Sequence, residues 1–199
     1  MKVSTIFYNM LLGITIACTA LAASAQTPEQ DAQQNTDRIL KHISEHREAY
    51  LQDPSKLYEF VDTTIIPNVD VPHVTKLILG SAYKDASQEQ RDRFATAFQR
   101  MLVRTYGNAL LEYSGEKIEY LPSTRAGDAT DTVIRSQFVP KNGPPVPVNY
   151  RAHLVDGKWK MYDIIVDNIS LVTNYRGSFS SEIRKNGLDA LIERLESRG

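Results

Sequence analysis

Cysteine is almost absent from this chain. The one cysteine, Cys18, lies in an apolar segment near the N-terminus, so the rest of the chain has no internal disulfide and no thiol nucleophile. Long apolar runs are equally scarce: Met10–Leu21 is too short to cross a bilayer comfortably, and no other long apolar run follows. Neither sign of charge dominates, since 23 basic residues accompany 24 acidic ones without a basic cluster. Nucleic acid and anionic membrane surfaces are therefore not expected partners.

The N-terminus predicts export. Lys2, the apolar run and the cleavage site Ala23-Ser24-Ala25 have the order of a secretory signal peptide. We expect residues 1–25 to be removed, so that the mature chain begins at Gln26. An uncleaved anchor and a lipoprotein modified at Cys18 are alternatives, but the residues before Cys18 lack the leucine usual in lipoproteins. Export without disulfides indicates a bacterial periplasm.

A recognisable catalytic motif is also lacking. No serine sits in a nucleophile elbow, and no glycine-rich loop could cradle a phosphate. The histidines do not give a complete ligand set, so we predict no metal site and expect these side chains to face solvent. They are His42, His46, His73 and His153. Strand alternation predicts that Tyr162 and Asp163 lie on opposite sheet faces, which argues against joint acid–base chemistry. We expect Asp163 to bind a helix N-terminus or an arginine instead.

What is present begins with helices. Thr27-Pro28-Glu29-Gln30 and Ser87-Gln88-Glu89-Gln90 are capping boxes, and Asp53 and Asp70 are further N-cap candidates. Apolar residues follow each of these starts at helical spacing. The pattern predicts helices over about 28–51, 54–65, 71–79 and 88–113.

Strands follow in the second half. Strand patterns cover about 118–121, 130–139, 146–155 and 159–166, and Asp156-Gly157 predicts a two-residue hairpin turn between the last two. Ser170 is the N-cap candidate of a helix that ends near Gly187, and a final helix follows. Because hairpins dominate, we predict an α+β fold with an antiparallel sheet packed on the long helix. A gap between sheet and helix must be filled by side chains or by a ligand.

Several segments together carry a family resemblance. They are 102–106, 109–115, 145–150, 159–163, 170–176 with Phe179, and 187–192. In this order they resemble the MlaC family, also called the toluene-tolerance Ttg2 auxiliary family. The likeness covers roughly residues 30–196, and it is weakest in the first helix and at 123–130.

The resemblance implies a periplasmic phospholipid carrier. Such a carrier moves glycerophospholipid between an outer-membrane lipoprotein–porin complex and an inner-membrane ABC transporter with MCE-domain subunits, and so maintains outer-membrane lipid asymmetry. The implied fold is like nuclear transport factor 2, with an added helical part enclosing a hydrophobic cavity. We therefore expect one phospholipid-binding domain over 26–199, mainly helical over 26–86 and sheet-and-helix over 87–199. We expect a monomer, no cofactor and no enzymatic activity.

Bulky apolar residues of the long helix, the strands and the following helix are the candidates for contact with lipid. They are Leu102, Tyr106, Leu110, Val133, Val148, Tyr150, Ile164, Val166, Leu171 and Tyr175. For each of them, ordinary core packing is the alternative. Arg104, Arg151 and Arg176 are candidates for headgroup or partner contacts, with surface ion pairing as the alternative.

Two other functions remain open. The chain could be an isomerase or dehydratase that acts on an apolar substrate in the same cavity, which requires a carboxylate or histidine facing that cavity. It could also be a non-catalytic adaptor whose cavity is filled by its own side chains. The direction of Asp163 and the size of the cavity distinguish these possibilities.

Overall fold

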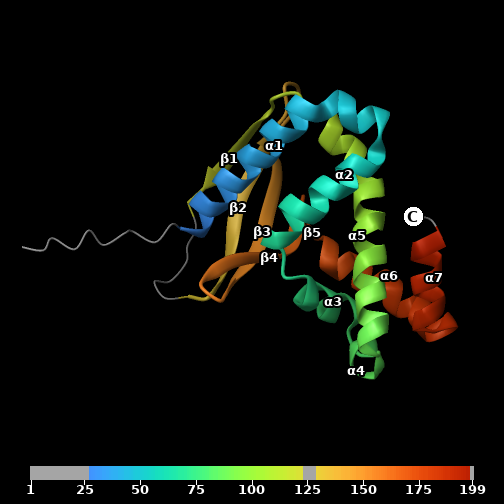
Figure 1. The fold of residues 1–199 in the computed structure, drawn as a ribbon. Coiled ribbons are helices and arrows are strands. Elements are labelled where there is room, and N and C mark those ends of the chain that lie inside the picture. Colours follow the sequence, from blue (N-terminus) through green and yellow to red (C-terminus); the bar gives the residue numbers. More distant parts are fainter. Residues whose placement is uncertain (1–26, 123–128, 198–199) are drawn as a thin grey trace, which may run out of the picture.

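The computed structural model describes residues 27–122 and 129–197, so the predicted leader lies outside the described residues. Helices come first, a five-stranded sheet follows, and two helices end the chain (Figure 1). The predicted α+β class is confirmed.

The helices of the described residues include every helix that a capping residue predicted. They are α1 (Pro28–Gln52), α2 (Pro54–Phe60), α3 (Val71–Leu79), α4 (Ala82–Asp85), α5 (Gln88–Leu111), α6 (Leu171–Asn186) and α7 (Leu188–Ser197). Both capping boxes are formed, by Thr27 with Gln30 and by Ser87 with Gln90. At the N-caps of α1, α2, α3, α5 and α6, a side-chain oxygen accepts from a backbone N–H that has no partner inside the helix.

The connection from α2 to α3 departs from the predicted continuous helix. A π-helical turn spans Val61–Ile65, and a 3-10 turn follows at Ile66–Asn68. The Ile66 N–H donates to the Val61 carbonyl, five residues back. Pro67 has no N–H to continue the helical pattern, and the chain leaves the helix within two residues of it. The short α4 was not predicted either.

The sheet is an antiparallel meander in the order β1-β2-β3-β4-β5. Its strands are β1 (Lys117–Leu121), β2 (Asp131–Val139), β3 (Val146–Val155), β4 (Lys158–Val166) and β5 (Ile169–Ser170). Asp156 and Gly157 both have positive φ, as a two-residue hairpin turn requires, which confirms that prediction. Asp167 and Asn168 also have positive φ and turn the chain into the short β5, which was not predicted.

The two faces of the sheet have different environments. Ile134 pairs with Tyr150, which pairs with Ile164, and this row belongs to the face that lies against α1; we call it the inner face. One residue along, Val133 pairs with Arg151, which pairs with Asp163, and this row belongs to the outer face. Figure 1 shows α1 lying across the sheet. The Tyr120 hydroxyl ties the two together by donating to Thr36 Oγ1 of α1 at 2.8 Å.

The densest packing lies among the helices. α3, α5, α6 and α7 enclose an apolar cluster, which we call the helical core. Its fully buried members are Ile78, Leu79, Phe94, Ala97, Phe98, Phe179, Leu191, Ile192 and Leu195. Phe179 meets Phe94 edge-on, with ring centroids 5.9 Å apart, a favourable aromatic geometry. A second, smaller cluster joins α1, α2 and α5 around Ile43, Leu57 and Leu111.

Candidate functional site

A pocket lies between α1 and the inner face of the sheet. Apolar side chains of both elements line it, together with a few polar groups and residues from the turn before α3. The lining residues are Pro28, Asp31, Ala32, Asn35, Thr36, Ile39, Ile65, Asn68, Ile134, Tyr150, Ala152, Trp159 and Met161. Alternation along β3 directs Tyr150 and Ala152 into the pocket, and the pairing of β2 with β3 brings Ile134 beside Tyr150.

The pocket is small, about 60 Å³. This is room for only a few water-sized groups. A long apolar ligand therefore fits here only if α1 and the sheet move apart or if lining side chains turn away. The small size also agrees with the alternative in which the chain fills the space with its own side chains.

The polar groups around the pocket are mostly satisfied within the protein. The Ser136 hydroxyl donates to the Val148 carbonyl, and the Asn149 side-chain oxygen accepts from the Ser136 N–H. Burial raises the pKa of Tyr150 to about 12, so its hydroxyl is neutral at ordinary pH. Burial also raises the pKa of Asp31. The interface is thus largely uncharged and suits an apolar ligand.

Four of the predicted lipid-contact residues share the inner face. Val148 pairs with Val166 and Tyr150 pairs with Ile164, so they form one continuous patch across β3 and β4. Tyr150 lines the pocket, and Val166 is exposed. The structure therefore brings these four together as expected, and their contact with lipid stays a prediction.

Val133 does not belong with them. It pairs with Arg151 on the outer face and is 42% exposed. The residues of β2 that face inward are its neighbours Thr132 and Ile134, both buried. The sequence shows the alternation of β2 but not its register with β3, which is why Val133 was chosen in place of the inward-facing residues of β2. Val133 is accordingly not part of the inner-face patch.

The remaining apolar candidates lie on the helices. Leu102 and Tyr175 pack against the helical core, and Leu110 packs against the smaller cluster. Tyr106 is 40% exposed, with its hydroxyl oxygen 3.4 Å from that of Tyr175. Leu171 is the first residue of α6 and is half-buried. None of these five is among the pocket-lining residues.

Each of the three candidate arginines lies on a different helix or strand. Arg104 is exposed on α5. Arg151 on the outer face lies 4.0 Å from the Asp163 carboxylate. Arg176 on α6 packs against Gly80, where a Cβ would lie 3.3 Å from its Nε. Gly80 has φ of +57°, a region that other residues rarely adopt, so this approach depends on glycine.

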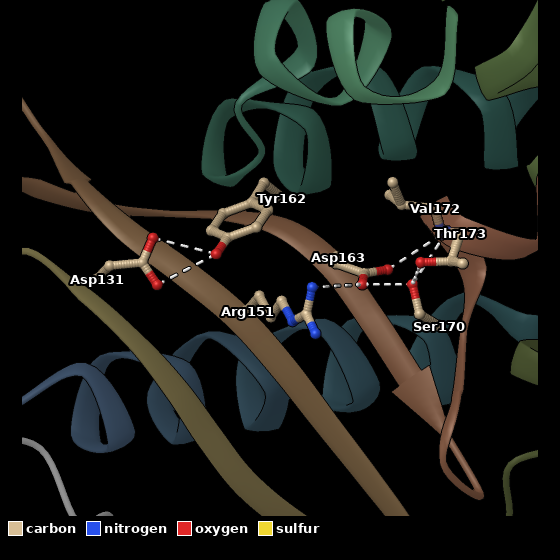
Figure 2. Close-up of polar contacts among 7 residues, drawn as sticks. All are labelled: Asp131, Arg151, Tyr162, Asp163, Ser170, Val172 and Thr173. Carbon is tan, nitrogen blue, oxygen red and sulfur yellow. Dashed lines mark hydrogen bonds and ion pairs between the residues drawn. The ribbon is translucent and has the colours of Figure 1, made fainter. Parts of the chain in front are cut away.

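Asp163 is surrounded by hydrogen-bond donors on the outer face of the sheet (Figure 2). Its side chain is 1% exposed, and it accepts hydrogen bonds from the Ser170 hydroxyl and the Val172 N–H. Ser170 in turn caps α6. The carboxylate thus anchors the N-terminus of α6 on β4, with Arg151 nearby, which confirms the expected role. It points away from the pocket, where an acid–base catalyst would be needed.

The expectation that Tyr162 and Asp163 lie on opposite sheet faces is wrong. The β3–β4 register shifts after Arg151, because Arg151 pairs with Asp163 whereas Ala152 pairs with Met161, which leaves Tyr162 as a bulge. Its hydroxyl donates to both oxygens of Asp131, at 3.0 and 3.1 Å, on the same face as Asp163 (Figure 2). The bulge shifts the inward positions of β4 by one residue, but Tyr162 and Ile165 are themselves large apolar residues and mask this shift in the sequence.

Several lining residues were missed, namely Ile39, Ile134, Ala152, Trp159 and Met161. Ala152 could have been found, because it shares the predicted inward alternation of Tyr150. The others depend on strand register, on the bulge or on the placement of α1. No helix in the described part of the chain is long and apolar enough to span a bilayer.

Comparisons with known proteins cover nearly the whole chain. The MlaC protein family matches residues 33–197. Toluene tolerance protein Ttg2D of Pseudomonas putida is 32% identical over 90% of this chain and 83% of its own length. The intermembrane phospholipid transport system binding protein MlaC of Haemophilus influenzae is 28% identical over 96% of this chain and 90% of its own.

A solved structure shows the same fold. The phospholipid-binding protein of Ralstonia solanacearum, determined in complex with a phospholipid, matches with a TM-score of 0.81 and 29% sequence identity. The match covers 87% of this chain and 97% of the other. The agreement in sequence and in fold leads to one conclusion: the chain belongs to the MlaC family.

Proposed function

We propose that this protein is a periplasmic carrier of glycerophospholipid. In this proposal it receives lipid from, or delivers lipid to, an outer-membrane lipoprotein–porin complex and an inner-membrane ABC transporter with MCE-domain subunits. The observation that carries the proposal is the likeness to a protein solved with a phospholipid bound, a likeness that covers 97% of that other protein's chain. The export signal expected at residues 1–25 supports the periplasmic location.

The energetics require an enclosed apolar site. Burial of an acyl chain gains about 0.8 kcal/mol per methylene, so two chains gain on the order of 20 kcal/mol. The patch of Val148, Tyr150, Ile164 and Val166, continued by Ile134, offers an apolar wall of suitable chemistry. The acyl chains would lie between this wall and α1.

Loading requires the wall and α1 to separate, because the present space is only about 60 Å³. The contacts that resist separation are modest: the Tyr120–Thr36 hydrogen bond and apolar packing around Ile39. A neutral hydrogen bond contributes about 1 kcal/mol net. Acyl burial exceeds this cost several times over, so lipid itself can hold the open form.

The arrangement of Asp163 favours a carrier over an enzyme. Both of its oxygens accept hydrogen bonds from the capping region of α6, on the face away from the pocket. Nearer the pocket, the neutral Tyr150 and the half-buried Asp31 do not form a hydrogen-bonded acid–base pair in the described residues. Arg104, Arg151 and Arg176, all exposed, remain the proposed sites for headgroup or partner contacts.

The direct test is lipid mass spectrometry of the mature protein purified without detergent. We expect about one phospholipid per protein molecule. A homogeneous, folded preparation with no stoichiometric phospholipid, which also takes up none from vesicles, would contradict the proposal.

A matched pair of substitutions tests the wall. Val148→Asp places a charge on the inner face and should abolish lipid occupancy, because a buried carboxylate cannot be solvated among acyl chains. Val133→Asp makes the same change on the outer face and should retain lipid. Circular dichroism reports folding of both variants, and Val166→Asp, at an exposed position of the inner face, serves if Val148→Asp does not fold. Full occupancy in a folded inner-face variant would show that the wall is wrongly assigned.

A further inference from the structure

Three side chains that are distant in sequence converge beside β3. Asp70 caps α3, His73 lies in its first turn, and His153 lies on β3. One potential ligand atom of each lies within 4.8 Å of the other two, and all three residues are half-buried. The His153 Nε2 and Asp70 Oδ2 atoms are 2.8 Å apart. The expectation that His73 and His153 simply face solvent is therefore wrong, because the fold brings their rings together, with centroids 4.9 Å apart.

The backbone holds this cluster in place from two sides. The Asp70 N–H donates to the Met161 carbonyl at 2.9 Å, and Val69 forms a parallel bridge with Met161. Asp70 Oδ1 accepts the His73 N–H at 2.9 Å, which leaves Oδ2 directed at His153. Asp70 and His73 thus sit on a helix start that is fixed to the sheet, and His153 sits on the sheet itself.

We propose that Asp70, His73 and His153 form a binding site for a divalent transition-metal cation of the Zn²⁺ type. Two imidazoles and one carboxylate are a ligand set that such cations accept, with remaining positions taken by water. Tetrahedral ligands at about 2.0–2.1 Å from the metal lie roughly 3.3 Å apart, so the atoms need to approach by about 1.5 Å at most. Mg²⁺ and Ca²⁺ prefer oxygen ligands and are not expected.

The surroundings support binding. The ring of Tyr162 packs against both imidazoles, with centroids 5.1 Å from His73 and 4.9 Å from His153, which restricts their orientation. The Tyr162 hydroxyl donates to Asp131, so a second carboxylate lies just outside the cluster.

The site is distinct from the lipid pocket. Ala152 lines the pocket on the inner face, whereas the adjacent His153 pairs with Asp131 and belongs to the outer face. A bound cation would join α3, and with it the helical core, to the sheet. Lipid occupancy and metal occupancy can therefore be measured separately.

The test is titration of the tag-free mature protein, treated with a chelator, with Zn²⁺ by calorimetry, and with Ca²⁺ for comparison. We expect one Zn²⁺ per chain, an increase in Tm with Zn²⁺, and no binding of Ca²⁺. His73→Gln and His153→Gln should each weaken the affinity more than tenfold. Asp70→Asn keeps an N-cap side chain and a hydrogen-bond partner for His153, so it removes the carboxylate with little risk to folding.

The chain offers a matched control in a second histidine pair. His42 and His46 stack on α1 with ring centroids 4.0 Å apart, one helical turn from each other. The double variant His42→Gln/His46→Gln should bind Zn²⁺ as tightly as the natural chain. The proposal is overturned if Zn²⁺ does not bind stoichiometrically, if the His42/His46 variant loses it, or if folded Asp70→Asn and His73→Gln proteins retain full affinity.

Discussion

The helical core and the interface between α1 and the sheet are built in different ways. The core is closed by large apolar side chains with no exposure, such as Phe94, Ile78 and Ile192. The interface contains hydroxyl groups, two amides, a carboxyl group and residual space, and its central residues Tyr150 and Met161 are only partly buried. The first region stabilises the fold, and the second can be rearranged at low cost, which is where a carrier needs to open.

The largest effect is expected in the helical core. Phe94→Ala removes a fully buried ring and leaves a cavity among close-packed neighbours, so it should cost about 3–5 kcal/mol of unfolding free energy. Urea denaturation measures this cost. Ile39→Ala at the interface is the comparison, and an equal or larger loss there would remove the distinction between the two regions.

The next effect is expected where the helical core is anchored to the sheet. Asp163→Ala leaves the Ser170 hydroxyl and Val172 N–H without their acceptor and frees Arg151, so we expect a loss of roughly 3 kcal/mol. Tyr162→Phe removes a more exposed hydrogen bond on the same face and should cost well under 1 kcal/mol. Similar costs for the two variants would argue against the anchoring role.

Burial of Tyr150 at the interface should make the stability of the protein fall at alkaline pH. The Tyr150 pKa is raised to about 12 in the folded protein, against about 10 in an unfolded chain. The neutral form is thus favoured by folding, so this contribution is complete below pH ~10 and is lost as the pH rises through ~12, by about 3 kcal/mol. Stability of the natural chain relative to Tyr150→Phe should fall across this range. A constant difference would mean that the hydroxyl is not buried in solution.

A smaller effect than those of Phe94→Ala, Asp163→Ala and Tyr150 ionisation is expected at the link between α1 and the sheet. Tyr120→Phe removes the hydrogen bond to Thr36 and should lower stability by only about 1 kcal/mol. Because this bond opposes separation of α1 from the wall, lipid exchange with vesicles should become faster. Tyr113→Phe, whose hydroxyl bonds the Glu116 carbonyl within its own loop, is the control and should leave exchange unchanged.

Local signals predicted most of the fold. Helix starts at Pro28, Pro54 and Gln88 followed from capping chemistry, and the Asp156-Gly157 hairpin followed from turn chemistry. These features depend on residues a few positions apart. The role of Asp163 was predicted correctly from a premise that the structure overturns, because strand alternation placed Tyr162 and Asp163 on opposite faces and the bulge brings them to the same face.

The candidate site was predicted less completely because it depends on distant pairings. Val133 was assigned to the wall because strand register cannot be read from one strand. The cluster around His73 and His153 was missed because 80 positions separate residues that only the fold brings together. The π-helical turn at Val61–Ile65 also leaves no local pattern that distinguishes it from an α-helix.

The bulge at Tyr162 has an implication for how this sequence can change. Side chains of a strand alternate between the two faces of the sheet with a period of two residues. The bulge inserts one extra residue into this alternation. If β4 paired regularly, without the bulge, Tyr162 would lie opposite Ala152 and every side chain before it on β4 would be inverted. Trp159 and Met161 would then leave the lining that they share with Tyr150. Deletion of Tyr162 would instead remove the bulge and leave Met161 opposite Ala152, so this strand can lose one residue at this position and keep both of its ends facing their present neighbours.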